Sequence, residues 1–284
     1  MTTEGMESTG TSPEGKGQSP PPGVKIVEVK FSLTDILEVM RVGLRRAAVF
    51  MGLGCNAARR EDFNDYQLDH ATRIRVLPET VDSATLKQWK DEFYRWIVAG
   101  GLRELVDHIN VFLDRIYEAA AVLRENRLDA KMHSKFQRAG LEDKVKTLKR
   151  RFNLSCRYPE EFVSIGAVRN CFVHRLGAVG REDAGAGGVL VLKWFGFELL
   201  VMAAEGTEHP LSLSPEQVFE PIALPNGGTV AARLRIFEQR FALGEKAVLT
   251  PHTLHQVIFS TEQMATDYVR RLEEMAQKMG RVEK

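Results

Sequence analysis

The sequence predicts a mostly α-helical protein with a smaller β-containing part in its C-terminal half and a closing C-terminal helix. Three observations carry this prediction. Apolar residues recur at helical spacing through most of the first 177 residues, two apolar and partly β-branched runs follow between residues 189 and 202, and helical spacing returns after residue 253. With 284 residues, 44% of them hydrophobic, the chain is long enough to bury a sizeable core.

Four segments are expected along the chain. Residues 1–23 are rich in Gly, Ser, Thr, Pro and Glu and hold too little apolar surface to offset the entropy of ordering, which predicts a disordered N-terminal tail. Residues 24–180 are expected to form a helical bundle. A polar, Gly-rich stretch then opens a β-containing insertion over residues 181–253, and residues 254–284 are expected to form a C-terminal helix that packs back on the bundle.

Apolar periodicity in the N-terminal part predicts four helices, over residues 34–51, 84–126, 141–152 and 160–177. Gly52 and Gly54 are expected to stop the first helix, and the Gly100-Gly101 pair to break or kink the second. The last of the four is expected to end at Gly177, since glycine is favoured just past a helix C-terminus. The polar stretch between the first two helices has room for a short helix around residues 60–69.

The C-terminal part has a different pattern. Residues 189–194 and 197–202 read as two strands, because both runs are apolar and partly β-branched or aromatic. Residues 230–241 alternate in a way that fits either a helix or a strand, and residues 244–250 fit a short strand. An amphipathic helix is predicted over residues 253–279.

Charge and cysteine content narrow the class of protein. The formal net charge is only +1, which argues against non-specific, charge-driven binding to nucleic acid as the main activity but leaves room for a local basic site. The cysteines, Cys55, Cys156 and Cys171, are odd in number and widely spaced, so no disulfide framework is expected and a reducing cytoplasm is the simplest location. The most apolar stretch, residues 189–204, is too short to span a bilayer, so no membrane association is expected.

The segment from Phe162 to Val179 carries the residues with the clearest chemistry, Arg169, Asn170 and His174. Metal-independent RNA cleavage needs a group that engages the ribose 2′-OH, a proton donor for the leaving 5′-oxygen, and positive charge on the phosphorane. Histidine shuttles protons near neutral pH, and arginine offers a permanently charged fork for phosphate oxygens. Asparagine has both a donor and an acceptor with which to orient a substrate.

This segment resembles the motif of the HEPN superfamily, in which an arginine, a polar residue, three variable residues and a histidine lie near the C-terminal end of a helix in a bundle. The helix LEDKVKTLKRRF (residues 141–152) and the turn HRLGAV (residues 174–179) also look like abortive-infection-type HEPN proteins. The resemblance is local and covers residues 84–180. It implies a metal-independent endoribonuclease that works through 2′-OH attack, without a cofactor, as a toxin or phage-defence effector with an antitoxin or other regulatory partner.

In that activity Arg169 would bind and stabilise the phosphate, His174 would do acid/base work or polarise the 2′-OH, and Asn170 would orient the substrate or His174. On a helical wheel Asn170 and His174 share a face, whereas Arg169 and His174 diverge by about 140°. HEPN proteins typically dimerise so that two motif helices face each other, and the resemblance therefore implies a C2 homodimer through the motif helix.

Two alternatives stand beside the catalytic hypothesis. HEPN-like bundles also serve as non-catalytic RNA-binding or protein-interaction scaffolds. An Arg–Asn–His group at a helix end can also have a purely structural role, capping carbonyls and binding a neighbouring carboxylate.

Additional phosphate contacts are expected from Arg175 and from Lys149, Arg150 and Arg151, the last three within a cation-rich run between Lys131 and Arg157. The competing interpretation of the run is a solvated helix face, and that of Arg175 is a cation in the last helical turn. No metal site is expected, because His252 and His255 lack further ligands nearby in the sequence.

Overall fold

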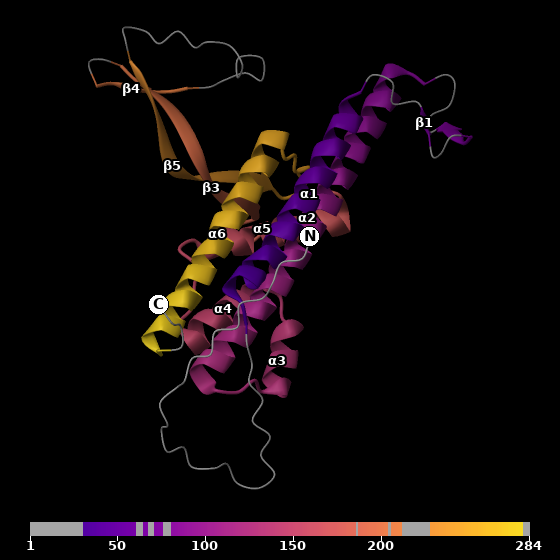
Figure 1. Ribbon diagram of the computed structural model, residues 1–284. Helices are drawn as coiled ribbons and strands as arrows, with labels where there is room; N and C mark the ends of the chain where they lie inside the picture. The colour runs from indigo at the N-terminus through magenta and orange to yellow at the C-terminus, as the bar shows by residue number, and fades with distance from the viewer. Residues whose placement is uncertain are drawn as a thin grey trace, which may run out of the picture. The chain divides into compact units, whose positions relative to one another are not determined.

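The computed structural model describes residues 31–60, 65–67, 71–75, 81–185, 187–203, 206–211 and 228–280. Over these residues the protein is mostly helical, with six helices, a three-stranded antiparallel sheet, and a C-terminal helix that closes the fold, as predicted (Figure 1). The predicted disordered tail, residues 1–23, lies outside the described residues. No described helix has the length and apolarity needed to cross a membrane.

Two long helices form the centre of the bundle, α1 (Leu33–Arg59) and α2 (Ser83–Glu125). The Ser32 hydroxyl caps α1 by accepting a hydrogen bond from the Asp35 backbone N–H at 3.2 Å, and the Asp82 carboxylate caps α2. Both helices run on through the glycines that were expected to interrupt them. The predicted stop of α1 at Gly52 and Gly54 is therefore wrong, and so is a break of α2 at Gly100-Gly101; a kink there, the other expected outcome, stays a prediction.

Close packing between α1 and α2 explains Gly54 and Gly101. A Cβ atom at Gly101 would lie 2.1 Å from Met51 Cγ, and one at Gly54 would lie 2.5 Å from Ile97 Cγ2. Glycine is required at these positions because the neighbouring helix occupies the space of a side chain. The helical hydrogen bonds continue because the packing energy of a long interface outweighs the low helix propensity of glycine.

Three shorter helices pack beside α2: α3 (Ala130–Gln137), α4 (Leu141–Phe152) and α5 (Pro159–Arg175). The helix predicted over residues 141–152 is confirmed to the residue, whereas α3 was not anticipated. Helix α5 ends at Arg175, followed by Leu176 in the left-handed conformation (φ 48°) and Gly177 at φ 83°. The expected end near Gly177 is thus correct within two residues.

A short hairpin, β1 (Asp65–Gln67) with β2 (Arg73–Arg75), lies between α1 and α2 in the sequence. A short helix was considered around residues 60–69, but residues 65–67 form strand β1, so the helix is wrong there. Residues 61–64 and 68–70 lie outside the described part.

The larger sheet has the order β4-β3-β5, built from β3 (Val189–Met202), β4 (Glu208–Pro210) and β5 (Thr229–Ala242). The two strands expected over residues 189–202 are one continuous strand, paired with β5 along its whole length. The ambiguous run at residues 230–241 belongs to β5. Residues 244–250 form no strand, only an isolated bridge between Lys246 and Ala178.

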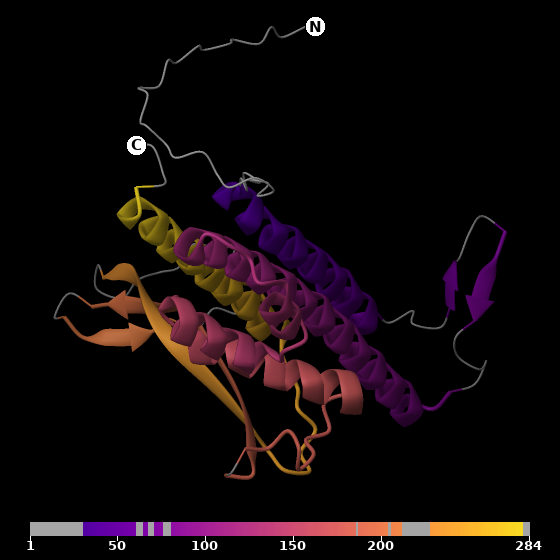
Figure 2. The same ribbon diagram turned by 90° about the horizontal axis from the view of Figure 1, so that it is seen from below.

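Helix α6 (Pro251–Lys278) closes the structure. It packs against α1, α2 and β3, and Figure 1 shows it running beside α1. Three rings join α2, α5 and α6 at the centre of the core: Tyr268 lies with its ring centroid 6.3 Å from that of Phe112 and 6.0 Å from that of Phe162. Helix α5 lies between this core and the sheet, against β3 (Figure 2). Its outward residues are therefore held on a rigid support.

Candidate functional site

Helix α5 presents the predicted motif. Its inner face is apolar and buried, with Phe162, Ile165, Val168 and Phe172 all at most 1% exposed. Pro159 opens the helix at a position where its missing N–H costs nothing, and glutamates follow in the first turn, near the positive end of the helix dipole. Because the inner positions are fixed by packing, the motif residues are displayed on the remaining faces of the helix.

Arg169 is held between α5 and α2. Its Nη1 atom donates to Asn170 Oδ1 at 3.0 Å, and its Nη2 atom donates to Asp107 Oδ1 at 3.2 Å. Its side chain is 22% exposed, and its buried Nε atom has no hydrogen-bond partner among the described residues. The guanidinium therefore reaches its neighbour Asn170, although the two positions point in different directions on the helical wheel.

Asn170 and His174 are exposed, as their shared outer face predicts. No hydrogen bond or ion pair of the His174 ring occurs within the part of the chain that the structure describes. Near the end of the helix, the carbonyls of Cys171, Phe172 and Arg175 accept hydrogen bonds from the backbone N–H groups of the following turn. His174 is consequently not used as a cap, and its ring is accessible from solvent.

Arg175 is neutralised within the chain. Its guanidinium binds both carboxylate oxygens of Asp183, with Nε 2.7 Å from Oδ2, and its Nη1 lies 2.7 Å from Glu182 Oε1. The Asp183 side chain is only 2% exposed. Burial disfavours its charged form, but the bonds from Arg175 and from the Gly180 N–H hold the pKa of Asp183 below its usual range. This arrangement is typical of a structural cation that fastens the loop after α5. Arg175 also lies in the last turn of the helix, as its alternative interpretation stated.

The three predicted phosphate contacts on α4 differ in whether the chain already pairs them with a carboxylate. Arg151 forms a fork-to-fork pair with Glu125, at 2.8 and 2.6 Å, and also donates to the Tyr117 hydroxyl at 2.5 Å. Lys149 and Arg150 are exposed. Arg151 thus ties α4 to α2, which leaves Lys149 and Arg150 as the accessible cations of the set.

The motif and the α4 cations lie at different places along α2. Arg169 contacts Asp107, whereas Arg151 contacts Tyr117, ten residues further along the same helix. At roughly 1.5 Å per residue, these two positions are separated by about 15 Å along the helix axis. The structure therefore brings Arg169 and Asn170 together but does not bring the α4 cations to them.

Asp107 is the contact that sequence reasoning missed. It is an exposed carboxylate on a charged helix surface, 62 residues from its partner in the sequence, and no local pattern distinguishes it from its neighbours. Only the packing of α5 against α2 makes it part of the motif.

Metal or thiol chemistry has no obvious centre in the described residues. They contain no group of three or more His, Cys, Asp or Glu side chains arranged to hold a metal ion. Cys171, within the motif, is buried, and burial raises the pKa of its thiol to about 12. It is a packing residue rather than a nucleophile.

Comparison with models of known families, with curated proteins and with solved structures finds no match to this chain.

Proposed function

We propose that this protein is a metal-independent endoribonuclease of HEPN type, acting in the cytoplasm as a toxin or phage-defence effector. The observation that supports it best is the outer surface of α5, where His174 is exposed without a partner in the described chain and Asn170 is exposed beside it. Arg169 is linked to the same surface through its hydrogen bond to Asn170. A base or acid, an orienting amide and a fixed cation therefore lie on one helix.

Each residue has a distinct role in this proposal. The His174 imidazole would move a proton at the ribose 2′-OH or at the leaving 5′-oxygen. The Asn170 carbonyl oxygen already accepts from Arg169, which leaves its amide N–H groups to donate to substrate. Arg169 would stabilise the phosphorane. Its pair with Asp107, which is 50% exposed, is the kind of partly solvated ion pair that a phosphate can replace at low cost.

A second copy of the chain would complete this site. Two α5 helices related by a two-fold axis would place two Arg169–Asn170–His174 sets in one cleft. Mixing an Arg169→Ala chain with a His174→Ala chain is then expected to restore part of the cleavage that each has lost alone.

The second candidate function is a non-catalytic RNA-binding or protein-interaction scaffold. The observation that favours it is the Arg169–Asp107 ion pair, because a carboxylate already occupies one edge of the guanidinium that would meet the phosphate. In that case the surface of α5 would bind without cleaving.

The test is RNA cleavage by the full chain in the presence of EDTA, with the product ends identified by mass spectrometry. His174→Ala should lower the cleavage rate by about 100-fold or more, as expected for loss of an acid/base group. His255→Ala, an exposed histidine on α6, is the matched control. Arg103→Ala is the control for Arg169→Ala, because Arg103 Nε also faces Asp107, at 3.7 Å.

Products with a 2′,3′-cyclic phosphate and a 5′-hydroxyl, lost in His174→Ala and Arg169→Ala but kept in both controls, would support the nuclease. Equal cleavage by the parent and the motif variants would refute it. RNA binding without cleavage by the parent, weakened in Arg169→Ala, would instead identify the scaffold.

A further inference from the structure

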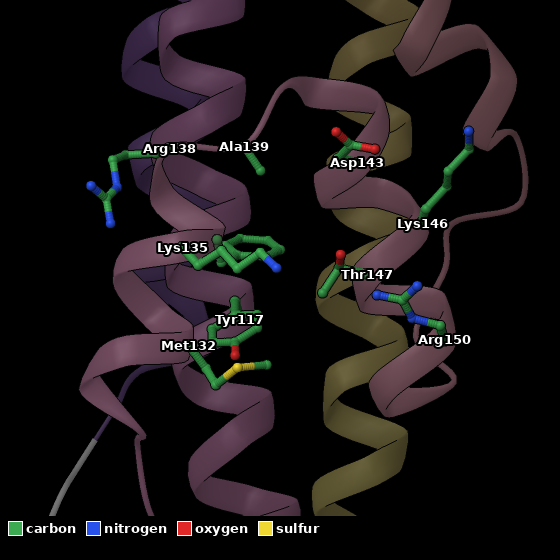
Figure 3. Close-up of a pocket in the computed structure, with 10 residues that line it drawn as sticks. Tyr117, Met132, Lys135, Arg138, Ala139, Asp143, Lys146, Thr147 and Arg150 are labelled. Atoms are coloured by element: carbon green, nitrogen blue, oxygen red, sulfur yellow. The ribbon is translucent and has the colours of Figure 1, made fainter.

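An open groove of about 560 Å³ lies between α3 and α4, above Tyr117 of α2 (Figure 3). Met132 and Lys135 line it from α3, and Thr147 and Arg150 line it from α4. The rings at its base are almost fully buried, but Met132 is 43% exposed and forms an apolar part of the wall. The volume is within the range of about 300–1,000 Å³ that is usual for small-molecule sites.

Two cations face each other across this groove. Figure 3 shows Lys135 and Arg150 extending toward one another from the two helices, whereas Arg138 and Lys146 point away from the gap. Within the ranges that the structure describes, neither Lys135 nor Arg150 has an ion-pair or hydrogen-bond partner for its side chain.

Three other cations near the groove are already paired with carboxylates. Lys144 lies 2.8 Å from Asp114, Arg151 is bidentate on Glu125, and Lys146 lies 2.5 Å from Glu142. An anion placed between Lys135 and Arg150 would relieve the repulsion of two like charges and bind to both.

Thr147 lies between the two cations and adds a hydroxyl (Figure 3). A threonine inside a helix commonly donates to the carbonyl four residues earlier, as Thr261 does to Val257 at 2.8 Å and Thr266 does to Glu262 at 2.9 Å. No such bond involves the Thr147 hydroxyl among the described residues. It is therefore available to donate to an oxyanion.

The Asp143 carboxylate restricts the class of ligand that the groove can bind. Asp143 lines the same groove one helical turn before Thr147. Its carboxylate adds to the negative charge that raises the pKa of Lys146, but it forms no hydrogen bond or close ion pair in the described chain. An extended polyanion laid along the groove would meet this negative charge, whereas a ligand with hydroxyl or amino groups would donate to it. The groove is also much larger than an inorganic phosphate needs.

We propose that the α3–α4 groove binds a small phosphomonoester, with the phosphate held by Lys135, Arg150 and Thr147 and hydroxyl groups of the ligand body donating to Asp143. A sugar phosphate and a nucleoside monophosphate both have this chemistry. The proposal does not depend on the nuclease, because the groove and the motif lie about 15 Å apart along α2.

Isothermal titration calorimetry of the full chain tests this with three probes: inorganic phosphate, glucose 6-phosphate and adenosine monophosphate. Saturable binding of at least one phosphomonoester, tighter than that of inorganic phosphate, is expected. Lys135→Gln, Arg150→Gln and Thr147→Val should each weaken it by about tenfold or more, because each removes a hydrogen bond to a charged group. Asp143→Asn should weaken the phosphomonoester but not inorganic phosphate.

Arg124→Gln is the control, because Arg124 is an exposed arginine of α2 that does not line the groove. It should leave binding unchanged, and thermal melting should show that all variants fold. The proposal is overturned if no phosphomonoester binds, if inorganic phosphate binds as tightly, or if Arg124→Gln weakens binding as much as Arg150→Gln. Binding of an RNA oligomer alone, without either phosphomonoester, would also overturn it.

Discussion

Replacing Gly101 by alanine should destabilise the protein, although alanine is the better helix former. The new Cβ would lie 2.1 Å from Met51 Cγ and 2.5 Å from Met51 Sδ, where ordinary contact begins near 3.4 Å. Met51 is only 3% exposed, so its side chain has no free space into which to move. Either α1 and α2 must separate or Met51 must adopt a strained rotamer.

The size of the effect follows from two opposing contributions. Overpacking a buried contact costs about 1–3 kcal/mol, and removing a helical glycine gains about 0.5–1 kcal/mol. The clash involves Cγ, near the root of the side chain rather than its flexible end, which places the cost in the upper part of that range. We expect a net loss of about 1–2 kcal/mol in the free energy of unfolding.

Gly52→Ala is the matched control, because a Cβ at Gly52 would meet nothing within 4 Å. It should raise the free energy of unfolding by about 0.5–1 kcal/mol. Urea unfolding followed by circular dichroism measures both changes. Adding Met51→Ala to Gly101→Ala should cost less than Met51→Ala costs in the parent, because the smaller side chain relieves the clash. If Gly101→Ala stabilised the protein as much as Gly52→Ala, close helix packing could not be the reason for this glycine.

Three further predictions concern a buried charge, acid unfolding and thiol reactivity. Asp114→Ala should cost about 3 kcal/mol of unfolding free energy, because it strands Lys144, which is 1% exposed, without its carboxylate. Lys144→Met, which removes the buried charge, should cost less; the opposite order would contradict this account. Arg175 lowers the pKa of Asp183 in spite of the burial of this carboxylate. The ionised Asp183 therefore stabilises the folded protein above the pKa of an unfolded Asp, and this stabilisation is lost as the pH falls through the lower pKa of the folded state. Asp183→Asn should therefore be less stable than the parent near neutral pH, with the difference shrinking below about pH 4 in urea titrations; a constant difference would argue against the ion pair. Cys171, whose pKa burial raises to about 12, should resist iodoacetamide in the native protein and react in denaturant, as peptide mass spectrometry would show.

Helix positions were the most predictable part of the fold. Residues 141–152 repeat apolar side chains on one face, end in a cluster of cations and form α4 with the same bounds. Glycines were the main source of error, because their effect depends on what lies opposite. Gly101 weakens an isolated helix, but in the bundle it permits the close approach of α1, and local pattern cannot distinguish these two cases.

The prediction of two separate strands in the β region was wrong for a related reason. Residues 189–202 contain Gly196 between two apolar runs, which reads locally as two strands. Pairing with β5 along the whole length, from Val189 with Ala242 to Met202 with Thr229, holds the segment as one strand. The paired residues of β5 lie on average about forty residues away in the sequence, so a local pattern cannot indicate that β5 stabilises this segment as one strand.

For the candidate site, the helical pattern of the sequence was enough to predict which motif residues face outward. The spacing of Asn170 and His174 puts both on the exposed side of α5, because helical periodicity depends only on the backbone. Which cations are already neutralised depends instead on how the helices pack. Arg169 faces Asp107, Arg151 faces Glu125 and Arg175 faces Asp183, whereas Lys135 and Arg150 face each other. The free energy of a charge depends on the charges around it in space, and helix packing brings those together from distant parts of the chain.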